Sequence, residues 1–532
     1  MSSPAKNNTS FPQTRIFVIY CLSTLVSLFL TPVLLVVAFL MCTARLLISL
    51  YLRVRTNNTV KLVQCMDSFQ IFDRPNNLLE TYTLLILKGA GDLGKIKKAL
   101  SDKVINNVTY EKLRCRVVKK FGFYCWEILS PEEFRLEEHV KLVENNNLRI
   151  FPGLNNNTLE IKEAAFTEKQ VFEKLSEFYS CGMQIDKPRW EVNLVTKFSY
   201  ETDNLNDEIP QYAVIFRVHH SIMDGISMYL LISQALADVG VDVAKSMPFN
   251  PLKPLPIPLY LKFWTFLKLL FVWPKLMYES VGLPSESNCF HGPALSNKKI
   301  ITWTNHFTIE SLRKIRSCGG DGSKSKCFGT NAVLNAAVGG AFLRLAEIKG
   351  VRPVPREITG LTSIPMLPYP NLKPQNRFSG AFFPLRVGGV ESRLDRVRET
   401  DRTLKEITTS PLILLNSLLL RFIGTLPADW SQNLTDSREF TVLTSNIPGP
   451  SIPGYLFEGD ILMDVAGFLP IKNKTGFAFC FVSYCGKIRL TMVADAAVAS
   501  EQDVQILKEA FENEIVELER EAESHQYQPS NV

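Results

Sequence analysis

Two adjacent histidines, followed closely by an aspartate and a glycine, are the side chains in this sequence best suited to catalysis. They form the heptapeptide HHSIMDG at residues 219–225. An unperturbed imidazole has a pKa of about 6.5, so the second histidine, His220, is a suitable general base at neutral pH. The apolar residues 213–216 predict a strand before the motif, and the apolar residues 226–239 predict a helix after it. We therefore expect the motif at a strand-to-helix junction, where the end of a sheet presents side chains.

Asp224 and Gly225 complete the motif. Aspartate is favoured at helix N-caps, because its carboxylate accepts hydrogen bonds from the first N–H groups of a helix. An aspartate fixed in this way can also orient the loop through an arginine. Gly225 has no side chain and lets another group approach closely. The chain has only six histidines, so an adjacent pair followed by Asp-Gly favours catalysis over two structural core histidines.

Other common kinds of catalytic site lack their sequence signatures in this chain. The remaining histidines (His139, His291, His306 and His525) show no zinc-ligand spacing, and no metal is expected. There is no G-x-S-x-G elbow of a serine hydrolase. There is also no P-loop and no dinucleotide-binding fingerprint.

Length and composition describe a large folded protein. The chain has 532 residues, of which 46% are hydrophobic, enough for about two to four compact units. With 59 Lys and Arg against 53 Asp and Glu, the net charge of +6 is spread thinly, and no nucleic-acid partner is expected. The eleven cysteines include no CxxC pair, which indicates reduced thiols facing a cytosol-like compartment.

An uncharged stretch near the N-terminus predicts a transmembrane helix. Residues 16–44 carry no charge, and this run exceeds the roughly 20 apolar residues that a helix needs to cross a bilayer. Pro32 predicts a kink, with a re-entrant hairpin as the alternative to one tilted span. More basic residues follow the stretch than precede it, so the large C-terminal part should face the cytosol and the sequons at Asn7 and Asn8 the far side. We expect the endoplasmic reticulum membrane, with the plasma membrane as a second choice.

The chain is expected to divide into five segments. Residues 1–60 form the N-terminal tail and membrane anchor, 61–247 a first lobe with the histidine motif, and 298–522 a second lobe followed by a tail at 523–532. Between the lobes, residues 248–297 combine a proline-rich boundary with an aromatic stretch.

Apolar patterns within the two lobes predict individual elements. Residues 84–87, 190–199 and 212–218 predict buried strands, and a helix should begin at 94–100. Residues 501–521 have the apolar period of a helix that closes the fold.

The aromatic stretch at residues 259–281 has lysines only at positions 262, 268 and 275. Aromatic rings and spaced lysines suit the headgroup zone, which favours an interfacial helix. A linker helix packed between the lobes and a second membrane span are the alternatives. Farther on, the glycine-, serine- and lysine-rich residues 319–326 predict a mobile loop.

The spacing HHxxxDG at residues 219–225 resembles the motif of CoA-dependent acyltransferases and condensation domains. Further segments, in the right order, resemble the wax ester synthase/diacylglycerol O-acyltransferase family over most of the chain beyond the anchor. They are Met66–Phe69 (M-D-x-x-F), Asp186–Glu191 (P-L-W, with Arg189 in place of Leu), Thr330–Val333 (N-D, with Ala332 in place of Asp), Asn376-Arg377, Ser445–Pro450 (N-V-P-G-P), and Ser483–Gly486 with Asp495 (S-Y-x-G and a terminal Asp).

This resemblance implies an α/β (α+β) fold of two chloramphenicol-acetyltransferase-like lobes with a tunnel between them. Acyl-CoA would reach the tunnel from one face and the acceptor from the other. Trp190 would line the tunnel, and Asn331 and Asn446 belong to segments that the resemblance places at the substrate.

The resemblance also assigns catalytic roles. His220 would deprotonate the acceptor hydroxyl, which attacks the thioester directly, and Asp224 would orient the loop beside Gly225. The tetrahedral oxyanion needs a hydrogen-bond donor. Asn376 is the expected donor, with His219 or a backbone N–H near Gly225 as the alternatives.

The implied activity moves a fatty acyl group from acyl-CoA to diacylglycerol, a long-chain alcohol, or both. The products would be triacylglycerol or wax ester, with acyl-CoA as co-substrate and no other cofactor. A lipid bilayer is the expected partner, because these acceptors reside in it. The alternatives are a non-catalytic lipid-binding or membrane-tethering protein on the same scaffold, and an acyltransferase for a different small acceptor.

Overall fold

The computed structural model describes most of the chain between residues 13 and 526. Within that range it leaves out 75, 145–147, 153–158, 164, 201–209, 239–245, 247–249, 255–257, 279–287, 293–294, 320–326, 435–439 and 472–474. The sequons at Asn7 and Asn8 therefore lie outside the described residues, as does the loop predicted at 319–326 apart from its first residue.

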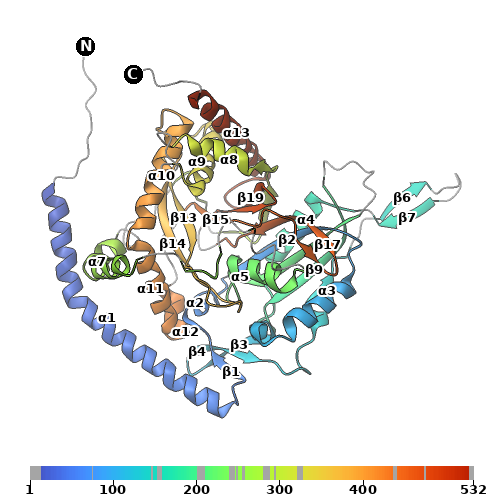
Figure 1. Ribbon diagram of the computed structural model, residues 1–532, viewed down its shortest axis with the longest axis horizontal. Coiled ribbons are helices and arrows are strands. Elements are labelled where there is room, and N and C mark those ends of the chain that lie inside the picture. The colour runs from blue at the N-terminus through green and yellow to red at the C-terminus, as the bar shows by residue number, and fades with distance from the viewer. Residues whose placement is uncertain are drawn as a thin grey trace.

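The N-terminal apolar stretch forms one continuous helix, α1 (Gln13–Arg55), along one side of the molecule (Figure 1). Pro32 lies inside α1 without ending it, so the hairpin alternative is not found. Within the described residues, α1 from Tyr20 onward is the single helix long and apolar enough to cross a membrane by itself. A bent pair, α10 (Arg393–Thr409) and α11 (Leu412–Thr425), passes the same test only if counted as one span.

The first lobe contains a seven-stranded sheet, and one of its strands leads directly into the histidine motif. Its strands lie in the order β16-β17-β2-β10-β9-β5, with β8 paired to β9. The three predicted strands are confirmed as parts of β2, β9 and β10. The bounds are β2 Glu80–Lys88, β5 Val140–Leu142, β8 Phe166–Thr167, β9 Trp190–Ser199, β10 Gln211–His219, β16 Tyr455–Leu456 and β17 Asp460–Phe468.

Successive side chains of β10 enter two different cores, which is why its sequence is an unbroken apolar run. Val214 and Phe216 join a core that includes α3 (Leu93–Leu100), so the predicted helix there is confirmed. Ala213 and Ile215 join a second core shared with the other lobe. The sheet is therefore buried on both faces.

The second lobe contains another seven-stranded sheet, in the order β11-β19-β18-β15-β13-β14 with β12 paired to β19. Its outer face packs against α8, α9, α10 and α13, which lie in the upper half of Figure 1. The final helix α13 confirms the helix predicted at 501–521. The bounds are β11 Lys299–Trp303, β12 Phe307–Thr308, β13 Glu357–Pro365, β14 Phe378–Arg386, β15 Val442–Ile447, β18 Phe477–Tyr484, β19 Lys487–Asp495, α8 Ile309–Ser317, α9 Thr330–Ile348 and α13 Glu501–Gln526.

The two lobes exchange structure through a late segment of the chain. Strands β16 and β17 belong by sequence to the second lobe, yet β17 pairs antiparallel with β2 of the first sheet. Tyr82 of β2 lies opposite Phe468 in this pairing. The sheet that holds the histidine motif is thus completed by residues from the far end of the chain.

Smaller elements surround the two sheets. A three-stranded sheet (β1-β4-β3) meets the C-terminal end of α1, and a β-hairpin (β6-β7) projects at the edge of the molecule (Figure 1). Helix α7 (Leu259–Met277) is the element predicted from the aromatic stretch, and it contacts both α1 and α11. The remaining bounds are α2 Cys65–Ser68, α4 Glu168–Ser180, α5 Gly225–Leu230, α12 Ala428–Leu434, β1 Val60–Leu62, β3 Cys115–Lys120, β4 Phe123–Ile128, β6 Leu148–Pro152, β7 Leu159–Glu163, the 3₁₀ segments Val108–Arg114 and Leu136–Glu138, and the π-helical segments Ser101–Ile105 and Leu231–Leu236.

Candidate active site

The histidine motif connects β10 to α5, as the sequence predicts. β10 ends at His219, and α5 begins at Gly225 and continues as a π-helical segment to Leu236. Asp224 is the N-cap of α5, and its Oδ1 accepts a hydrogen bond from the backbone N–H of Ser227 at 2.9 Å. The strand-to-helix junction and the N-cap reading of Asp224 are both confirmed.

His220, Asp224 and Gly225 line a cavity between the two lobes, whose empty space is about 1210 Å³ when the part open to solvent is included. The first lobe contributes β2, the loop that follows β10 and the start of α5, and the second contributes β13, β14 and β15. Most of the lining side chains are apolar, as suits a site for lipid. They include Leu79, Ile226, Met228, Leu361, Phe378, Phe440, Leu443, Ile447, Phe468 and Leu469.

The tautomer of His220 follows from its contact with Asn376. The Asn376 amide nitrogen donates to the backbone oxygen of His220 at 2.6 Å and to Oδ1 of Asp67 at 2.9 Å. Both of those partners are acceptors, so the amide oxygen must be the atom 2.9 Å from Nδ1 of His220. Nδ1–H of His220 therefore donates to Asn376, so in the neutral imidazole Nε2 holds the lone pair that a general base needs.

This geometry does not fit the oxyanion role predicted for Asn376. Both N–H bonds of its amide are occupied by Asp67 and by the backbone of His220. Asn376 is a positioning residue for the imidazole. His219 was the first alternative donor for the oxyanion, and its contacts are described below.

Behind Asn376 lies a buried ion pair that sequence reasoning missed. Nζ of Lys112 is 2.6 Å from Oδ2 of Asp67 and 2.6 Å from the backbone oxygen of Ile222, inside the motif. Burial raises the pKa of Asp67, and Lys112 and Asn376 oppose that rise. Burial also lowers the pKa of Lys112, against the pull of Asp67. The signal available in the sequence was the aspartate of the M-D-x-x-F segment.

Asp224 also ties the motif to the second lobe. Its Oδ2 accepts hydrogen bonds from the Tyr369 hydroxyl and from the backbone N–H of Arg377, each at 2.7 Å. The arginine link expected from the sequence is therefore made by the main chain, because the Arg377 guanidinium donates to Met366 instead. Burial raises the pKa of Asp224, while these donors and Ser227 favour its charged form.

His219 is fully buried and is held on both sides of its ring. Nδ1 lies 2.7 Å from the Ser221 hydroxyl, and Nε2 lies 3.2 Å from Oδ1 of Asp73, which is also paired with Arg189. Burial, with Arg189 and His220 nearby, holds the pKa of His219 well below its usual value. It is absent from the cavity wall, so the predicted catalytic role does not fit, and His219 is a neutral support for the loop.

Residues 375–519 match a family model described as the WS/DGAT C-terminal domain. This stretch of the second lobe is therefore similar to the C-terminal domain of wax ester synthases/diacylglycerol acyltransferases. The match begins one residue before Asn376 and spans the Ser445–Pro450 segment. A search of curated proteins found no match.

Solved structures share the two-lobe fold, which confirms the predicted fold class. The wax ester synthase/diacylglycerol acyltransferase of Marinobacter aquaeolei VT8 is 16% identical, with a TM-score of 0.55 over 87% of this chain and 99% of that chain. The trichothecene 15-O-acetyltransferase TRI3 of Fusarium sporotrichioides is 10% identical, with a TM-score of 0.56 over 86% and 95%. The first condensation domain of the calcium-dependent antibiotic synthetase is 14% identical, with a TM-score of 0.53 over 84% and 92%.

Of the other residues that the wax ester synthase/diacylglycerol acyltransferase resemblance places at the substrate, only one lines the cavity. Asn446 lines the cavity and donates to Oδ1 of Asn331 at 2.7 Å, whereas Asn331 itself lies on the exposed side of α9. Trp190 does not line the cavity. It stacks on His139 with ring centroids 4.6 Å apart and donates to the Leu113 backbone at 2.7 Å, so it is a core residue.

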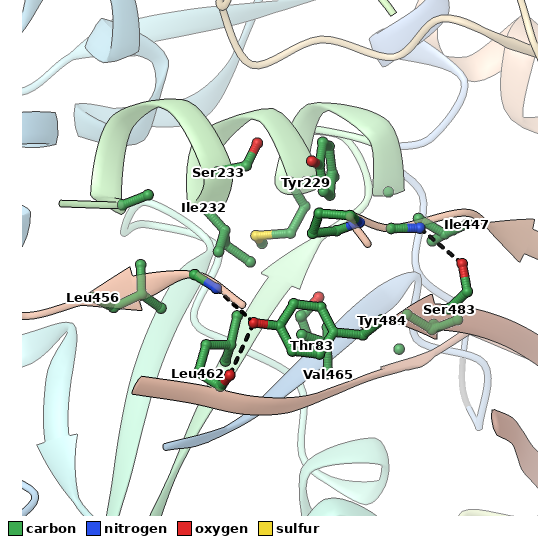
Figure 2. A pocket seen from close by; sticks show the side chains of 18 residues that line it. Thr83, Tyr229, Ile232, Ser233, Ile447, Leu456, Leu462, Val465, Ser483 and Tyr484 are labelled. Atoms are coloured by element: carbon green, nitrogen blue, oxygen red, sulfur yellow. Dashed lines mark hydrogen bonds between the residues drawn. The ribbon is translucent and has the colours of Figure 1, made fainter. Parts of the chain in front are cut away.

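A second, more apolar cavity adjoins the first and was not foreseen from the sequence. The two share Thr83, Gly225, Met228, Ile447 and Gly467 in their walls. Figure 2 shows the second cavity between the α5 helix and strands of both lobes. Its remaining lining residues are Tyr229, Ile232, Ser233, Ala237, Gly449, Pro450, Gly454, Leu456, Leu462, Val465, Val482, Ser483 and Tyr484.

The family's Ser-Tyr segment shapes this second cavity through main-chain contacts. The Ser483 hydroxyl accepts from the N–H of Gly449 at 3.0 Å, and the Tyr484 hydroxyl donates to Leu462 at 2.9 Å while accepting from Gly454 at 2.8 Å (Figure 2). These hydroxyls are therefore structural. Within the described residues, no group of three or more His, Cys, Asp or Glu side chains is placed to hold a metal ion.

Proposed function

We propose that this protein is a membrane-bound O-acyltransferase that moves a fatty acyl group from acyl-CoA to diacylglycerol or a long-chain alcohol. The single observation that supports it best is the contact between Asn376 and His220, because it assigns the lone pair of the neutral imidazole to Nε2, in a residue that lines an apolar cavity. The family is named for these two transfers.

In the proposed reaction, Nε2 of His220 removes the proton of the acceptor hydroxyl as its oxygen attacks the acyl carbonyl. A C–O bond forms and the carbonyl becomes a tetrahedral oxyanion. The oxyanion collapses, the C–S bond breaks, and the CoA thiolate takes the proton back from the imidazolium. No nucleophilic side chain is needed, because a thioester is already activated.

The oxyanion requires a hydrogen-bond donor, whose loss commonly costs about 2.7–4 kcal/mol of transition-state stabilisation. Asn376 and His219 are both committed to other partners. A backbone N–H near Gly225 remains the predicted donor. Its place at the cavity wall supports this role.

The acceptor assignment draws support from the anchor and from the cavity. Helix α1 supplies an apolar segment suited to a membrane, where long-chain alcohols and diacylglycerol reside. The cavity wall is rich in aliphatic and aromatic side chains, which suits acyl chains better than polar acceptors. We place the protein in the endoplasmic reticulum membrane with the catalytic part toward the cytosol.

The test is ester formation by membranes containing the protein, supplied with radiolabelled palmitoyl-CoA and either diacylglycerol or hexadecanol. His220→Ala should lose the activity, whereas His306→Gln, a change outside the cavity wall, should keep it. Label in triacylglycerol or wax ester names the preferred acceptor. Equal background from all proteins with every acceptor, at normal expression, would leave the non-catalytic lipid-binding scaffold as the better reading. Transfer only to a small soluble alcohol would support the alternative acyltransferase.

A further inference from the structure

Helix α7 presents a broad apolar face to the outside over its first two turns. Leu259, Tyr260, Phe263, Trp264 and Phe266 are each more than half exposed. In a helix with 3.6 residues per turn these positions form one face that spans about 160° of the circumference. An apolar face of this width is normally covered by a protein core or by lipid, and no protein core covers it in this part of α7.

The second half of α7 docks on α1 through a stripe of hydroxyl side chains. Ser23, Ser27 and Thr31 are spaced four residues apart, so they share one face of α1. Ser23 and Ser27 are almost completely buried, although the apolar side chains around them are exposed. The anchor thus covers its hydroxyl groups and leaves its hydrocarbon groups outward, the reverse of a helix surrounded by water.

The hydroxyl stripe satisfies main-chain groups that Pro274 disrupts. Proline has no N–H, so Pro274 inside α7 leaves the backbone oxygen of Leu270 without its helical donor. The Ser27 hydroxyl donates to that oxygen. The Ser23 hydroxyl donates to the Phe271 oxygen at 3.1 Å and accepts from the Lys275 N–H at 3.3 Å. Repair of a proline site by hydroxyls of a neighbouring helix is characteristic of membrane helices, where no water can do it.

Two further contacts join α7 to α1 close to the hydroxyl stripe. The Trp273 indole N–H donates to the Thr31 hydroxyl at 2.9 Å. The Lys275 ammonium group lies 5.1 Å from the centre of the Tyr20 ring. The other two lysines of α7, Lys262 and Lys268, are exposed and long enough to reach a headgroup region.

We infer that α7 is a second membrane-embedded segment, docked on α1 within the same lipid bilayer. This inference excludes a linker helix packed between the lobes, because such a helix would bury its aromatic side chains in protein. It applies equally to an interfacial helix and to a second span. The occupant of the exposed α7 surface is lipid hydrocarbon. The embedding does not depend on the proposed reaction.

If the proposed function holds, the two docked helices α1 and α7 also bring lipid close to the cavity that His220 lines. Helix α11 contacts both α1 and α7. It is fastened to β14 by the Ser379 hydroxyl, which donates to Ile413 at 2.9 Å, and by Asn416, which donates to Gly380 at 2.7 Å. Ser379 and Gly380 line the His220 cavity, so one helix and one strand separate the bilayer from the proposed base.

The first experiment uses the full chain in phosphatidylcholine vesicles with or without dibrominated acyl chains, which quench nearby tryptophans. Trp264→Phe should lose the largest share of bromine-dependent quenching, because Trp264 is 53% exposed on α7. Trp303→Phe is the matched control, since Trp303 is buried in the second lobe and should leave the quenched intensity unchanged. Undiminished quenching in Trp264→Phe would overturn the inference.

The second experiment tests the docking contact by trypsin cleavage in the same vesicles, with sites assigned by mass spectrometry. Ser23→Ala combined with Ser27→Ala should speed cleavage at Lys268 and Lys275 several-fold. Thr24→Ala is the control, because its hydroxyl bonds only within α1, to Tyr20 at 2.8 Å, and it should behave as the parent. Parent-like protection in the double variant would refute the docking. Neither experiment includes acyl-CoA, so the outcome is independent of catalysis.

Discussion

The amide oxygen of Asn376 lies 2.9 Å from Nδ1 of His220, and the two residues belong to different lobes. Asp67 fixes the orientation of the Asn376 amide, and Lys112 fixes Asp67. Because the ring orientation and tautomer of His220 depend on this series of contacts, the proposed base is complete only when both lobes are folded together.

Asn376→Ala should reduce kcat by about 10²–10⁴-fold, because His220 loses the acceptor that selects its Nδ1–H tautomer. KM for acyl-CoA should change little, since the amide N–H groups face protein and not the cavity. Steady-state kinetics with palmitoyl-CoA measures both. Asn371→Ala, in an exposed part of the same loop, is the control. A parent-like kcat in Asn376→Ala would show that Asn376 does not set the tautomer of His220.

Asp67→Asn should destabilise the protein by about 3–5 kcal/mol, because it leaves the buried Lys112 ammonium group without its counter-charge. Adding Lys112→Met should recover much of that loss, since the double variant then lacks both members of the ion pair. Methionine also keeps a side chain beside Trp126, whose ring centre lies 5.0 Å from Nζ of Lys112. Thermal or denaturant unfolding of the two single variants and the double variant measures the coupling. If the losses simply add, the two side chains do not act as a pair.

Stability should fall as the pH drops below about 6.5, in part because of His219. The pKa of His219 is lowered in the folded state, mainly by burial. Between that lowered pKa and the ordinary value of 6.5, only the unfolded chain takes up the proton, so acid favours unfolding. One such group contributes a slope of at most about 1.4 kcal/mol per pH unit.

His219→Gln checks this origin, because glutamine keeps a polar side chain and does not titrate. Between pH 5 and 6.5, the free energy of unfolding should change less steeply with pH in the variant. The difference in slope corresponds to the uptake of roughly one proton fewer on unfolding. Burial also lowers the pKa of His139, so His139 accounts for part of the slope that remains. An unchanged slope would mean that His219 is not the buried neutral group described.

Gly225→Ala should impair turnover more than folding. A Cβ at this position would lie 2.7 Å from Cδ1 of Ile447, the flexible end of a side chain that lines both cavities. Ile447 can yield only by moving into cavity space, so the passage between the cavities should narrow. We expect a loss of kcat that grows with acyl-chain length and a destabilisation of less than about 1.5 kcal/mol.

Ile447→Ala combined with Gly225→Ala should restore turnover with long acyl chains, because it removes the displaced atoms. Kinetics with a series of acyl-CoA chain lengths and thermal unfolding of the same samples make the comparison. A loss of activity that Ile447→Ala cannot relieve would point instead to the backbone N–H near Gly225.

The local features of the molecule were predictable from sequence because neighbouring residues determine them. The apolar run of β10, the N-cap at Asp224, the long anchor helix and the apolar period of α13 each depend on spacing within a few turns or strand positions. The ordered motifs also predicted the two-lobe fold, since they keep their order along the chain.

The roles of the polar residues were decided by tertiary structure. Asn376 meets His220 across 156 positions of sequence and Asp67 across 309, and no local pattern reveals such partners. Trp190 and His219 have sequence neighbours that suggest a cavity, yet the sheet directs both into the core. A buried polar group needs a hydrogen-bond partner, and the identity of that partner depends on which distant segments the packing of the two lobes brings together.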